Sequence, residues 1–535
     1  MSDSARDSLR RLVVTLTVTL LALPGAARAQ QRPAFAGLYR LYQGGTEVGR
    51  ERFERSGRVA EFSVVVPVIG LKLDSRTAFD STGAFQRFDA EAYNAAGDTL
   101  LGTFSVTASG ALLQTQSTSK RTGQTKTGQA AGPVAGVIPA QSVAVVALLA
   151  RRFARDTTIR MLIMGSDSVV PVTIAHHGDS ATVSFAGIAA TTLTTGGRAW
   201  PIDIAAQRVH AELWNGGDSL APLPGLRRPV ADYRAPAGAP YTAEEVRIPV
   251  RSLQGDTFSL AGTLTLPVAA ARPVPVVVTI TGSGQQTRDE DLWPLLPAYR
   301  PFRVIAERLA VAGIGVLRLD DRGAGGSTGA GGTTADFADD VRQEVAWLRR
   351  RPDVSRVALV GHSEGGAIAP LVAKDDATLA AIVLLAGPGK SGRAILTDQF
   401  RRPIETAPGL SDSARRAQLA LVSQRVDQVM QSSPWMRWFA AYDPLPTARA
   451  VRVPVLILQG ALDRQVSAGQ ADTLAAAFRA GGNRDVTVKV YPGLNHLFLH
   501  TDGDGSPTEY PALKDTTLPA QVQDDLAAWL TARLR

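Results

Sequence analysis

Five almost uninterrupted apolar runs in the second half of the chain limit the folds that it can adopt. The runs are VPVVVTI, GIGVLRL, VALV, AAIVLLA and VPVLILQG, at residues 274–280, 313–319, 357–360, 380–386 and 453–460. Strands that are covered on both faces have this composition. Segments of helical periodicity lie between the runs, and one of them aligns an apolar stripe of Phe337, Val341, Val345 and Leu348. The alternation predicts an α/β fold, with a mostly parallel sheet and helices on both faces.

The first half of the chain has a different pattern. Residues 30–235 consist of short β-branched or aromatic runs that are separated by Gly-Gly, Ser-Gly and Pro. This pattern predicts a β-rich domain with one helix at residues 140–155 and a mobile loop at the Thr-, Gln-, Ser- and Gly-rich residues 115–136. Residues 221–241 are rich in proline, which favours extended linker backbone. We therefore expect the α/β domain to span residues 236–535.

The first 29 residues are predicted to be an export signal. Three arginines precede an apolar run at residues 12–23, and the sequence ARA at residues 27–29 fits a small-x-small cleavage site. The run is shorter than the roughly 20 residues that a helix needs to cross a bilayer, which makes an uncleaved membrane anchor the weaker alternative. We expect an exported protein, periplasmic or extracellular, with no stable membrane insertion after cleavage.

Charge and cysteine content exclude several classes of protein. The formal net charge is +8, but Lys and Arg do not gather in a dense run with interleaved aromatics, so no nucleic-acid partner is expected. The chain has no cysteine, which rules out disulfides, thiolate catalysis and cysteine-ligated metal. His176 and His177 are adjacent on a predicted strand and point to opposite faces, so they are predicted to be structural. We expect neither a metal nor a cofactor.

Two G-x-S-x-G motifs each offer a candidate nucleophile: GGSTG at residues 325–329 and GHSEG at residues 361–365. A nucleophilic serine of this type lies in a sharp turn between a strand and a helix, which presents its hydroxyl above the edge of the sheet. Ser363 follows the apolar run VALV and precedes GGAIAPLVA, whereas Ser327 lies between turn-forming segments. We therefore predict that Ser363 is a nucleophile and that Ser327 is a loop residue.

A serine hydroxyl needs a base, and the base needs an acid that orients it. In a fold of this kind the acid and then the histidine follow the serine along the chain, each in a loop after a strand. His496 comes directly after the predicted strand VTVKVY, and Asp463 comes directly after VPVLILQG. These positions predict the set Ser363, Asp463 and His496. His500 is expected to pack or to face solvent, and Asp443, in a Tyr-Asp-Pro turn, is expected to be structural.

The same chemistry requires backbone N–H groups that bind an oxyanion. One is expected at Glu364, directly after the nucleophile. The other is expected in TGSGQQTRD, residues 281–289, with Ser283 as the first candidate and Gly284 as the second. A phosphate loop is the alternative here and at GPGKSG, but the latter has Leu384 where the P-loop pattern requires glycine.

Together these segments resemble the α/β-hydrolase superfamily, particularly bacterial esterases and the serine aminopeptidase-like group. The resemblance covers about residues 241–535 and rests on an ordered series of motifs: TGSGQQTRDED, LRLDDRGAGGSTG, GHSEGG, VLILQGALDRQV and YPGLNHLF. It implies the α/β-hydrolase fold and the same triad of Ser363, Asp463 and His496. Many members have His-Gly at the oxyanion loop, where this chain has Thr-Gly.

The resemblance also implies that an insertion at residues 388–450 forms a helical lid over the site. One segment of this insertion, SPWMRWFAAYDP, places four aromatic side chains close together in sequence: Trp435, Trp438, Phe439 and Tyr442. They are expected either to line an acyl or aromatic pocket or to pin the lid to the core.

These features predict an exported serine hydrolase that cleaves small-molecule carboxylic esters through an acyl-enzyme. A serine peptidase of the same fold is an alternative, because Glu364 would place a carboxylate where it can bind a substrate amine, although a helix N-terminus also favours an acidic residue. An acyltransferase is a further alternative if the lid excludes water. A non-catalytic lipid- or glycan-binding protein is the alternative of another class. The oligomeric state and the role of the N-terminal domain are not predicted.

Overall fold

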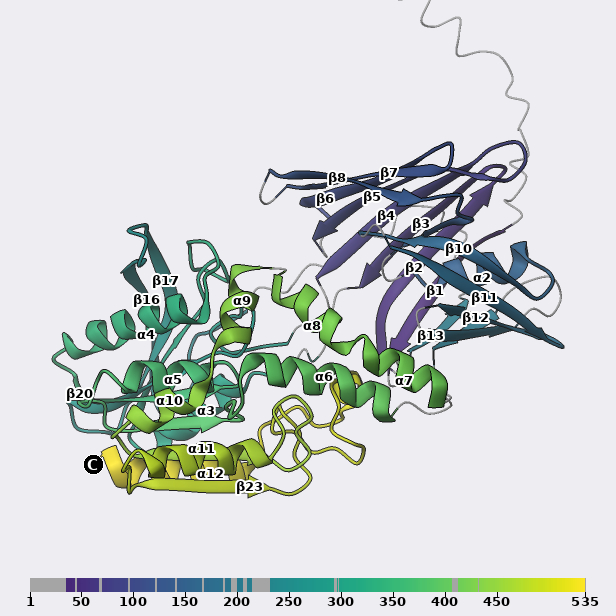
Figure 1. The fold of residues 1–535 in the computed structure, drawn as a ribbon. Helices are drawn as coiled ribbons and strands as arrows, with labels where there is room; N and C mark the ends of the chain where they lie inside the picture. The colour runs from purple at the N-terminus through teal and green to yellow at the C-terminus, as the bar shows by residue number, and fades with distance from the viewer. Residues whose placement is uncertain are drawn as a thin grey trace, which may run out of the picture.

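The computed structural model describes most of the chain after residue 34, and the described residues form two separate β-sheets (Figure 1). The predicted export signal and the first part of the proline-rich segment lie outside the described residues. Those residues are 35–43, 46–66, 70–94, 97–120, 123–139, 142–165, 168–185, 188–193, 200–204, 209–213, 231–292, 296, 298–406, 412–431 and 433–534.

The N-terminal part of the chain forms a sheet of fifteen strands, in the order β8-β7-β6-β5-β4-β3-β2-β1-β15-β14-β13-β12-β11-β10-β9. Neighbouring strands are antiparallel except β9 and β10, and the pairing of β1 with β15 joins the first and last strands. The strands are β1 (Phe35–Gln43), β2 (Thr46–Ser56), β3 (Val59–Val66), β4 (Leu71–Phe79), β5 (Phe85–Asn94), β6 (Leu100–Ser109), β7 (Leu112–Ser119), β8 (Thr125–Ala131), β9 (Gly136–Ile138), β10 (Thr157–Ile163), β11 (Val169–His177), β12 (Ser180–Phe185), β13 (Ile188–Leu193), β14 (Trp200–Ile204) and β15 (Val209–Leu213).

The prediction of a mobile loop at residues 115–136 is wrong. Most of this segment belongs to β7 and β8, which form an antiparallel hairpin at the edge of the sheet, with Thr115 opposite Gly128. In β7, Leu113 and Thr115 are buried while the residues between and beside them are exposed. An edge hairpin that covers the core with one face needs few apolar side chains, so its composition is close to that of a loop.

Helix α2 (Ala144–Arg152) occupies the middle of the segment predicted to be helical, and it packs against β12, β13 and β14. All of its residues before the two terminal arginines are buried. Glu51 in β2 accepts hydrogen bonds from the amides of Val143 and Ala144 and from the hydroxyl of Ser142. A strand side chain therefore caps the first turn of the helix, where backbone N–H groups lack partners. Burial raises the pKa of Glu51 to about 7.

The C-terminal part of the chain forms a sheet of eight strands, in the order β16-β17-β19-β18-β20-β21-β22-β23. β16 pairs with β17 and β17 pairs with β19, both in the antiparallel direction. The other neighbouring pairs are parallel. The five apolar runs of the sequence are the five strands β18 to β22. The strands are β16 (Tyr241–Arg251), β17 (Thr257–Pro267), β18 (Val274–Ile280), β19 (Gly315–Leu319), β20 (Val354–His362), β21 (Ile382–Leu385), β22 (Val455–Gly460) and β23 (Val486–Tyr491).

Helices cover both faces of this sheet, which confirms the predicted α/β fold (Figure 1). One face carries α4 (Thr334–Arg349), α5 (Gly365–Ala373), α10 (Pro444–Ala450) and α11 (Gly469–Ala480). The other face carries α3 (Pro301–Val311) and α12 (Ala520–Leu534). The apolar stripe predicted on α4, from Phe337 to Leu348, packs in the hydrophobic core on the first of these two faces.

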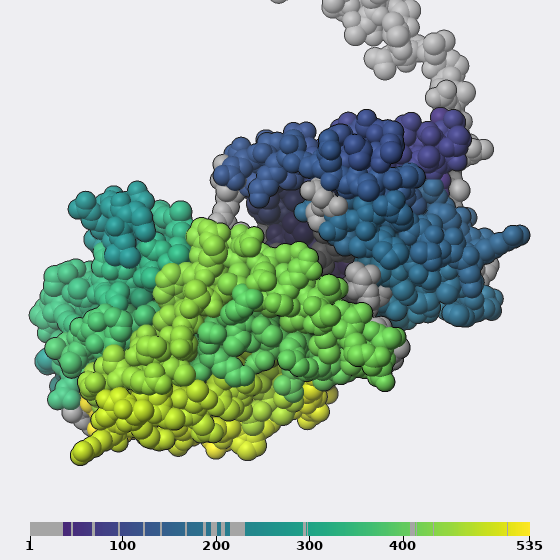
Figure 2. Space-filling view, in the orientation of Figure 1, coloured from purple at the N-terminus to yellow at the C-terminus, as the bar shows by residue number. Residues whose placement is uncertain are grey.

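The insertion predicted as a lid, residues 388–450, ends with α10, which packs on the sheet. The rest of the insertion contains four helices: α6 (Gly392–Thr406), α7 (Asp412–Ala420), α8 (Val422–Gln431) and α9 (Pro434–Ala441). They share a small apolar cluster of their own, made by Leu396, Ile404, Val422, Val426 and Ala440. In the space-filling view the N-terminal sheet and the C-terminal α/β part are two distinct bodies (Figure 2). None of the helices in the described part of the chain combines the length and the hydropathy needed to cross a lipid bilayer.

Candidate active site

Ser363 lies in a tight turn between β20 and α5. Its backbone φ is 54°, in the left-handed region that residues other than glycine rarely adopt. Its amide donates to the carbonyl oxygen of Leu385 in β21 at 2.8 Å. A Cβ atom on Gly361 would lie 2.0 Å from the carbonyl oxygen of Gly365, so the turn closes only with glycine at this position. The strand, turn and helix that the sequence predicts around Ser363 are present at the carboxyl edge of the sheet.

His496 and Asp463 form a buried hydrogen-bonded pair. Asp463 follows β22 and His496 follows the neighbouring strand β23, and the distance from His496 Nδ1 to Asp463 Oδ2 is 2.8 Å. Asp463 Oδ1 accepts the amides of Gln465 and Val466, and Oδ2 also accepts Gln459 Nε2, each at 2.8 Å. These donors fix the carboxylate so that it holds the proton on Nδ1 of His496 and leaves the lone pair on Nε2.

The structure brings the His496 loop against the serine turn. His362, which precedes Ser363, lies with its Nε2 3.0 Å from the backbone oxygen of His496, and the two imidazole rings are 5.0 Å apart. Among the hydrogen bonds of the described residues, none joins the Ser363 hydroxyl to the His496 ring. Contacts of this kind are often long or poorly aligned until a substrate binds.

Beside the serine turn lie three backbone amides that have no acceptor in the described part of the protein. Within the described residues, the amides of Glu364 and Ser283 make no hydrogen bond, and neither does that of Gly284. The loop after β18 packs directly on the turn, since a Cβ atom on Gly282 would lie 3.3 Å from Ser363 Cβ. The geometry therefore leaves both Ser283 and Gly284 as partners for Glu364 in an oxyanion hole.

Two carboxyl groups, half-buried Asp321 and buried Glu290, hold the loop after β18 in place. Asp321 accepts the hydroxyl of Thr281 at 2.7 Å and the amide of Gln286 at 2.9 Å. Burial raises the pKa of Asp321 to about 8. Glu290 accepts the amide of Gly282 at 2.7 Å. The start and the middle of the loop are thus anchored, by Asp321 after β19 and by Glu290 further along the same connection.

The side chain of Glu364 is buried and already occupied by protein donors. Its Oε1 accepts the hydroxyl of Thr334, at the start of α4, at 2.6 Å and the indole N–H of Trp435, in the lid helix α9, at 2.8 Å. Burial raises the pKa of Glu364. The residue directly after Ser363 is therefore bonded to α9, in the insertion predicted as a lid.

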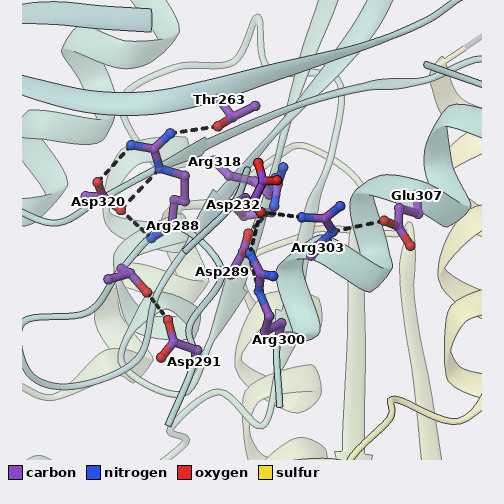
Figure 3. A network of polar contacts seen from close by, with 12 residues as sticks. Asp232, Thr263, Arg288, Asp289, Asp291, Arg300, Arg303, Glu307, Arg318 and Asp320 are labelled. Atoms are coloured by element: carbon purple, nitrogen blue, oxygen red, sulfur yellow. Dashed lines mark hydrogen bonds and ion pairs between the residues drawn. The ribbon is translucent and has the colours of Figure 1, made fainter. Parts of the chain in front are cut away.

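A network of charged groups lies under the loop at residues 287–291 (Figure 3). The Arg288 guanidinium binds Asp320 through Nη2 at 2.9 Å, and Arg300 Nε lies 2.7 Å from Asp289 Oδ2. Asp289 is fully buried and also binds Arg318. These pairs fix the backbone of the loop on the outer strands of the sheet.

Residues 232–234, in the proline-rich linker, also contact this network. The ring of Tyr233 lies between two guanidinium groups, with its centroid 4.1 Å from Cζ of Arg288 and 5.6 Å from Cζ of Arg300. Arg303 donates to the carbonyl oxygens of Asp232 and Arg234. Residues 232–234 are therefore docked on the α/β part of the molecule.

The rival candidates have structural contacts. The Ser327 hydroxyl donates to the carbonyl oxygen of Asp320 at 2.7 Å and accepts the amide of Ala261 at 2.8 Å, which ties its loop to β17. Asp443 caps α10 by accepting the amide of Leu445 at 3.0 Å. The His500 side chain is exposed.

The histidine pair of the N-terminal sheet lies on β11. His176 Nδ1 is 3.5 Å from Asp156 Oδ1, and His177 is exposed. In the part of the chain that the structure describes, no group of three or more His, Asp or Glu side chains is arranged to hold a metal ion.

Two residues of the site, Glu290 and His362, were not singled out by the sequence analysis. Glu290 stands in the charged stretch RDED, which is typical of an exposed loop, and His362 is the variable position of the serine motif. Both are buried, and His362 Nδ1 lies 2.8 Å from Glu290 Oε1. No spacing rule indicates such a pair, because the two residues are 72 positions apart.

The strand order, the strained serine turn and the His–Asp pair after the last two strands define the α/β-hydrolase fold. Residues 299–503 match the family model described as serine aminopeptidase, S33, which confirms the resemblance found in the sequence. The esterase EstD of Thermotoga maritima is 26% identical to the chain over 283 residues, which are 51% of this chain and 65% of the relative. The chain thus matches slightly less than two thirds of that protein's length.

Solved structures of similar shape include an esterase of Pyrococcus furiosus and the esterase domain of a Rhodothermus marinus protein. The first has a TM-score of 0.40 and 17% identity, and the match covers 57% of this chain and 97% of the esterase. The second has a TM-score of 0.34 and 18% identity, and the match covers 55% of this chain and all (100%) of the domain.

Proposed function

We propose that this protein is a serine hydrolase that cleaves carboxylic esters, with Ser363 as nucleophile, His496 as base and Asp463 as the orienting acid. The single observation that carries the proposal is the convergence of three loops: a serine at φ 54°, and a buried His–Asp pair whose histidine backbone is bonded to the residue before that serine. The esterase name of the Thermotoga maritima relative supports the choice of substrate.

In the proposed reaction, Ser363 Oγ attacks the ester carbonyl carbon while Nε2 of His496 takes the hydroxyl proton. The imidazolium is stabilised by Asp463 and then donates that proton to the leaving alcohol. Water repeats the sequence on the acyl-enzyme and releases the acid. The reaction requires the Ser363 hydroxyl and the His496 ring to come into hydrogen-bonding contact when substrate binds.

The negative charge that develops on the carbonyl oxygen would be bound by the amide of Glu364 and by that of Ser283 or Gly284. These amides have no hydrogen-bond acceptor among the residues that the structure describes, and they lie on segments held by buried side chains. Donors that are fixed before the reaction stabilise the oxyanion without reorganising, and one such donor is worth about 3 kcal/mol.

A peptidase is the second candidate, supported by the description of the matching family model. The Glu364 carboxylate does not favour it, since this group is buried and bonded to Thr334 and Trp435 instead of facing a substrate amine. Rates on an ester and on the matching aminoacyl amide would separate the two candidates. An acyltransferase would differ from both by transferring the acyl group to an added alcohol in water.

Export is part of the proposal and rests on the sequence of the first 29 residues. We infer that the mature protein acts on a small-molecule ester in the periplasm or outside the cell. Expression with the native N-terminus, followed by fractionation and N-terminal sequencing, tests this: the proposal requires a mature chain that begins near residue 30.

The catalytic assignment is tested by two serine substitutions. We expect Ser363→Ala to abolish both hydrolysis of a short-chain nitrophenyl ester and labelling by a fluorophosphonate probe, because the alanine has no hydroxyl to acylate. Ser327→Ala removes only the loop contacts of Ser327, so it should lower the melting temperature while most activity per folded molecule remains. Equal loss of labelling in both variants would contradict the assignment, and an unlabelled wild-type protein would favour a non-catalytic binding role.

A further inference from the structure

Glu290 occupies a strained position that the surrounding ion pairs hold. Its backbone φ is 56°, and it follows Asp289, which is locked between Arg300 and Arg318. A non-glycine residue in this conformation costs about 1 kcal/mol or more and persists where the surroundings fix it. Such strain often marks a side chain whose direction matters, which here is the direction of the Glu290 carboxylate.

One oxygen of this carboxylate joins two parts of the candidate site. Glu290 Oε1 accepts the amide of Gly282 at 2.7 Å and lies 2.8 Å from Nδ1 of His362. The other oxygen, Oε2, has no hydrogen-bond partner within the described structure. The carboxylate is 2% exposed, so its hydrogen bonds link the oxyanion loop to the serine turn and do not reach solvent.

His362 continues this link to the catalytic histidine. Its Nδ1 faces the Glu290 carboxylate, and its Nε2 faces the backbone carbonyl oxygen of His496 at 3.0 Å. Both partners are acceptors, so both ring nitrogens must donate, which only the imidazolium form can do.

The charges around His362 favour this form. Burial opposes a charge on the ring, but the Glu290 carboxylate and the His496 carbonyl outweigh it, with Asp463 adding to them, and raise the pKa of His362. The His362 ring also packs edge-on against the ring of Phe498, which carries no charge.

We propose that Glu290 and an imidazolium at His362 are positioning residues, which together hold the oxyanion loop and the backbone of His496 in register with Ser363. Glu290 holds the Gly282 amide and with it the start of the loop that carries the amides of Ser283 and Gly284. His362 fixes the carbonyl of His496 and with it the position of the imidazole. This inference rests on the proposed function, since it assigns roles in the same reaction.

Glu290→Gln isolates the charge from the hydrogen bonds. The amide oxygen of glutamine can accept both Gly282 and His362, as Oε1 of Glu290 does, but it cannot stabilise an imidazolium. Neutral His362 would then present the lone pair of Nε2 to the carbonyl of His496, and the His496 loop would move. We expect kcat per fluorophosphonate-titrated site to fall about 100-fold, the cost of misplacing a catalytic group by about 1 Å, while KM changes by less than about twofold.

A pair of substitutions at His362 tests the second link. His362→Gln keeps a donor near the Nε2 position, whereas His362→Leu keeps none. We expect the glutamine variant to retain clearly more of kcat than the leucine variant. Glu51→Gln is the matched control, because it makes the same change at a buried glutamate that also accepts backbone amides, but in the N-terminal sheet. Its kcat per titrated site should equal that of wild type.

The charge state of His362 can be read without turnover. The chain has six histidines, so ¹⁵N-histidine labelling gives few ring signals, and the His362→Gln variant identifies the one that is lost. At a pH of about 7.5, one unit above the ordinary histidine pKa, we expect both ring nitrogens of His362 to be protonated in the wild type and one to be deprotonated in Glu290→Gln.

A neutral His362 in the wild type, or a Glu290→Gln variant with unchanged kcat, would overturn the inference. A wild-type protein that is not labelled at Ser363 would instead overturn the proposed function, and the spectrum of His362 would still report on the pair. The two failures are therefore distinguishable.

Discussion

At the scale of single residues, the site depends on which atom holds each proton. Asp463 accepts one ring N–H, one side-chain N–H and two backbone amides, so as an acceptor-only group it fixes the His496 ring with its proton on Nδ1. An asparagine would keep the shape of this group but would place an NH₂ against Nδ1 of His496.

Asp463→Asn should therefore reverse the tautomer of His496. Nδ1 would accept from the asparagine, Nε2 would carry the proton, and no lone pair would face Ser363. We expect kcat for the nitrophenyl ester to fall about 10⁴-fold, as for the equivalent change in a well-characterised serine protease, while the fold stays intact. Circular dichroism and the melting temperature provide the control. A loss of less than about tenfold would show that Asp463 does not orient the base.

Single residues also mark the limit of prediction from the sequence. Ser363 and Asp463 could be proposed because each follows a recognisable buried strand, and His496 because it follows the strand at the edge of the sheet, so the fold implies that the three converge. Glu290 could not, because its burial depends on ion pairs between Asp289 and two arginines from other elements. Four consecutive charged residues indicate a solvated loop unless that distant packing is known.

At the scale of elements, the pattern of burial decides which strands and helix contacts can be predicted from the sequence. Strands covered on both faces were predictable, since burial on both faces favours apolar residues at nearly every position. The edge hairpin of β7 and β8 was not, because each strand buries only one face and the other face exposes Gln114, Gln116 and Gln129. The contacts of the lid were equally hidden, since no periodicity links Trp435 to Glu364, 71 residues away.

The hydrogen bond between Trp435 and Glu364 leads to a prediction about the helices of the insertion. Trp435→Phe keeps an aromatic ring for the stack on Phe439, but removes the N–H that binds the buried Glu364. Removing one partner of a buried acceptor costs about 1.5 kcal/mol, so we expect kcat/KM to fall about tenfold and proteolysis within α6 to α9 to become faster. Trp529→Phe is the control, because it loses an indole hydrogen bond to Thr487 on the far side of the sheet. Equal effects of both substitutions would exclude a specific lid contact.

At the scale of the whole molecule, the two sheets have separate hydrophobic cores. One core joins the N-terminal strands to α2, and the others join the C-terminal sheet to its own helices. Domains with separate cores can unfold as separate units. We expect calorimetry to resolve two transitions, with ester hydrolysis lost only in the transition of the C-terminal part.

The pH dependence of the N-terminal transition follows from Glu51. Burial raises the pKa of this carboxyl from 4.5 to about 7, so between these values the folded state binds a proton that the unfolded state releases. The contribution to stability is complete below the unfolded pKa and is lost as the pH rises through about 7. This loss amounts to about 3 kcal/mol, at roughly 1.4 kcal/mol per pKa unit.

Glu51→Gln should remove this part of the pH dependence of stability, because the amide oxygen can still accept the amides of Val143 and Ala144 without a charge to desolvate. The melting temperature of the N-terminal transition should then fall less between pH values of about 5 and 8 in the variant than in the wild type, while the C-terminal transition keeps its own pH dependence. Parallel pH profiles for the two proteins would show that Glu51 is not the titrating group.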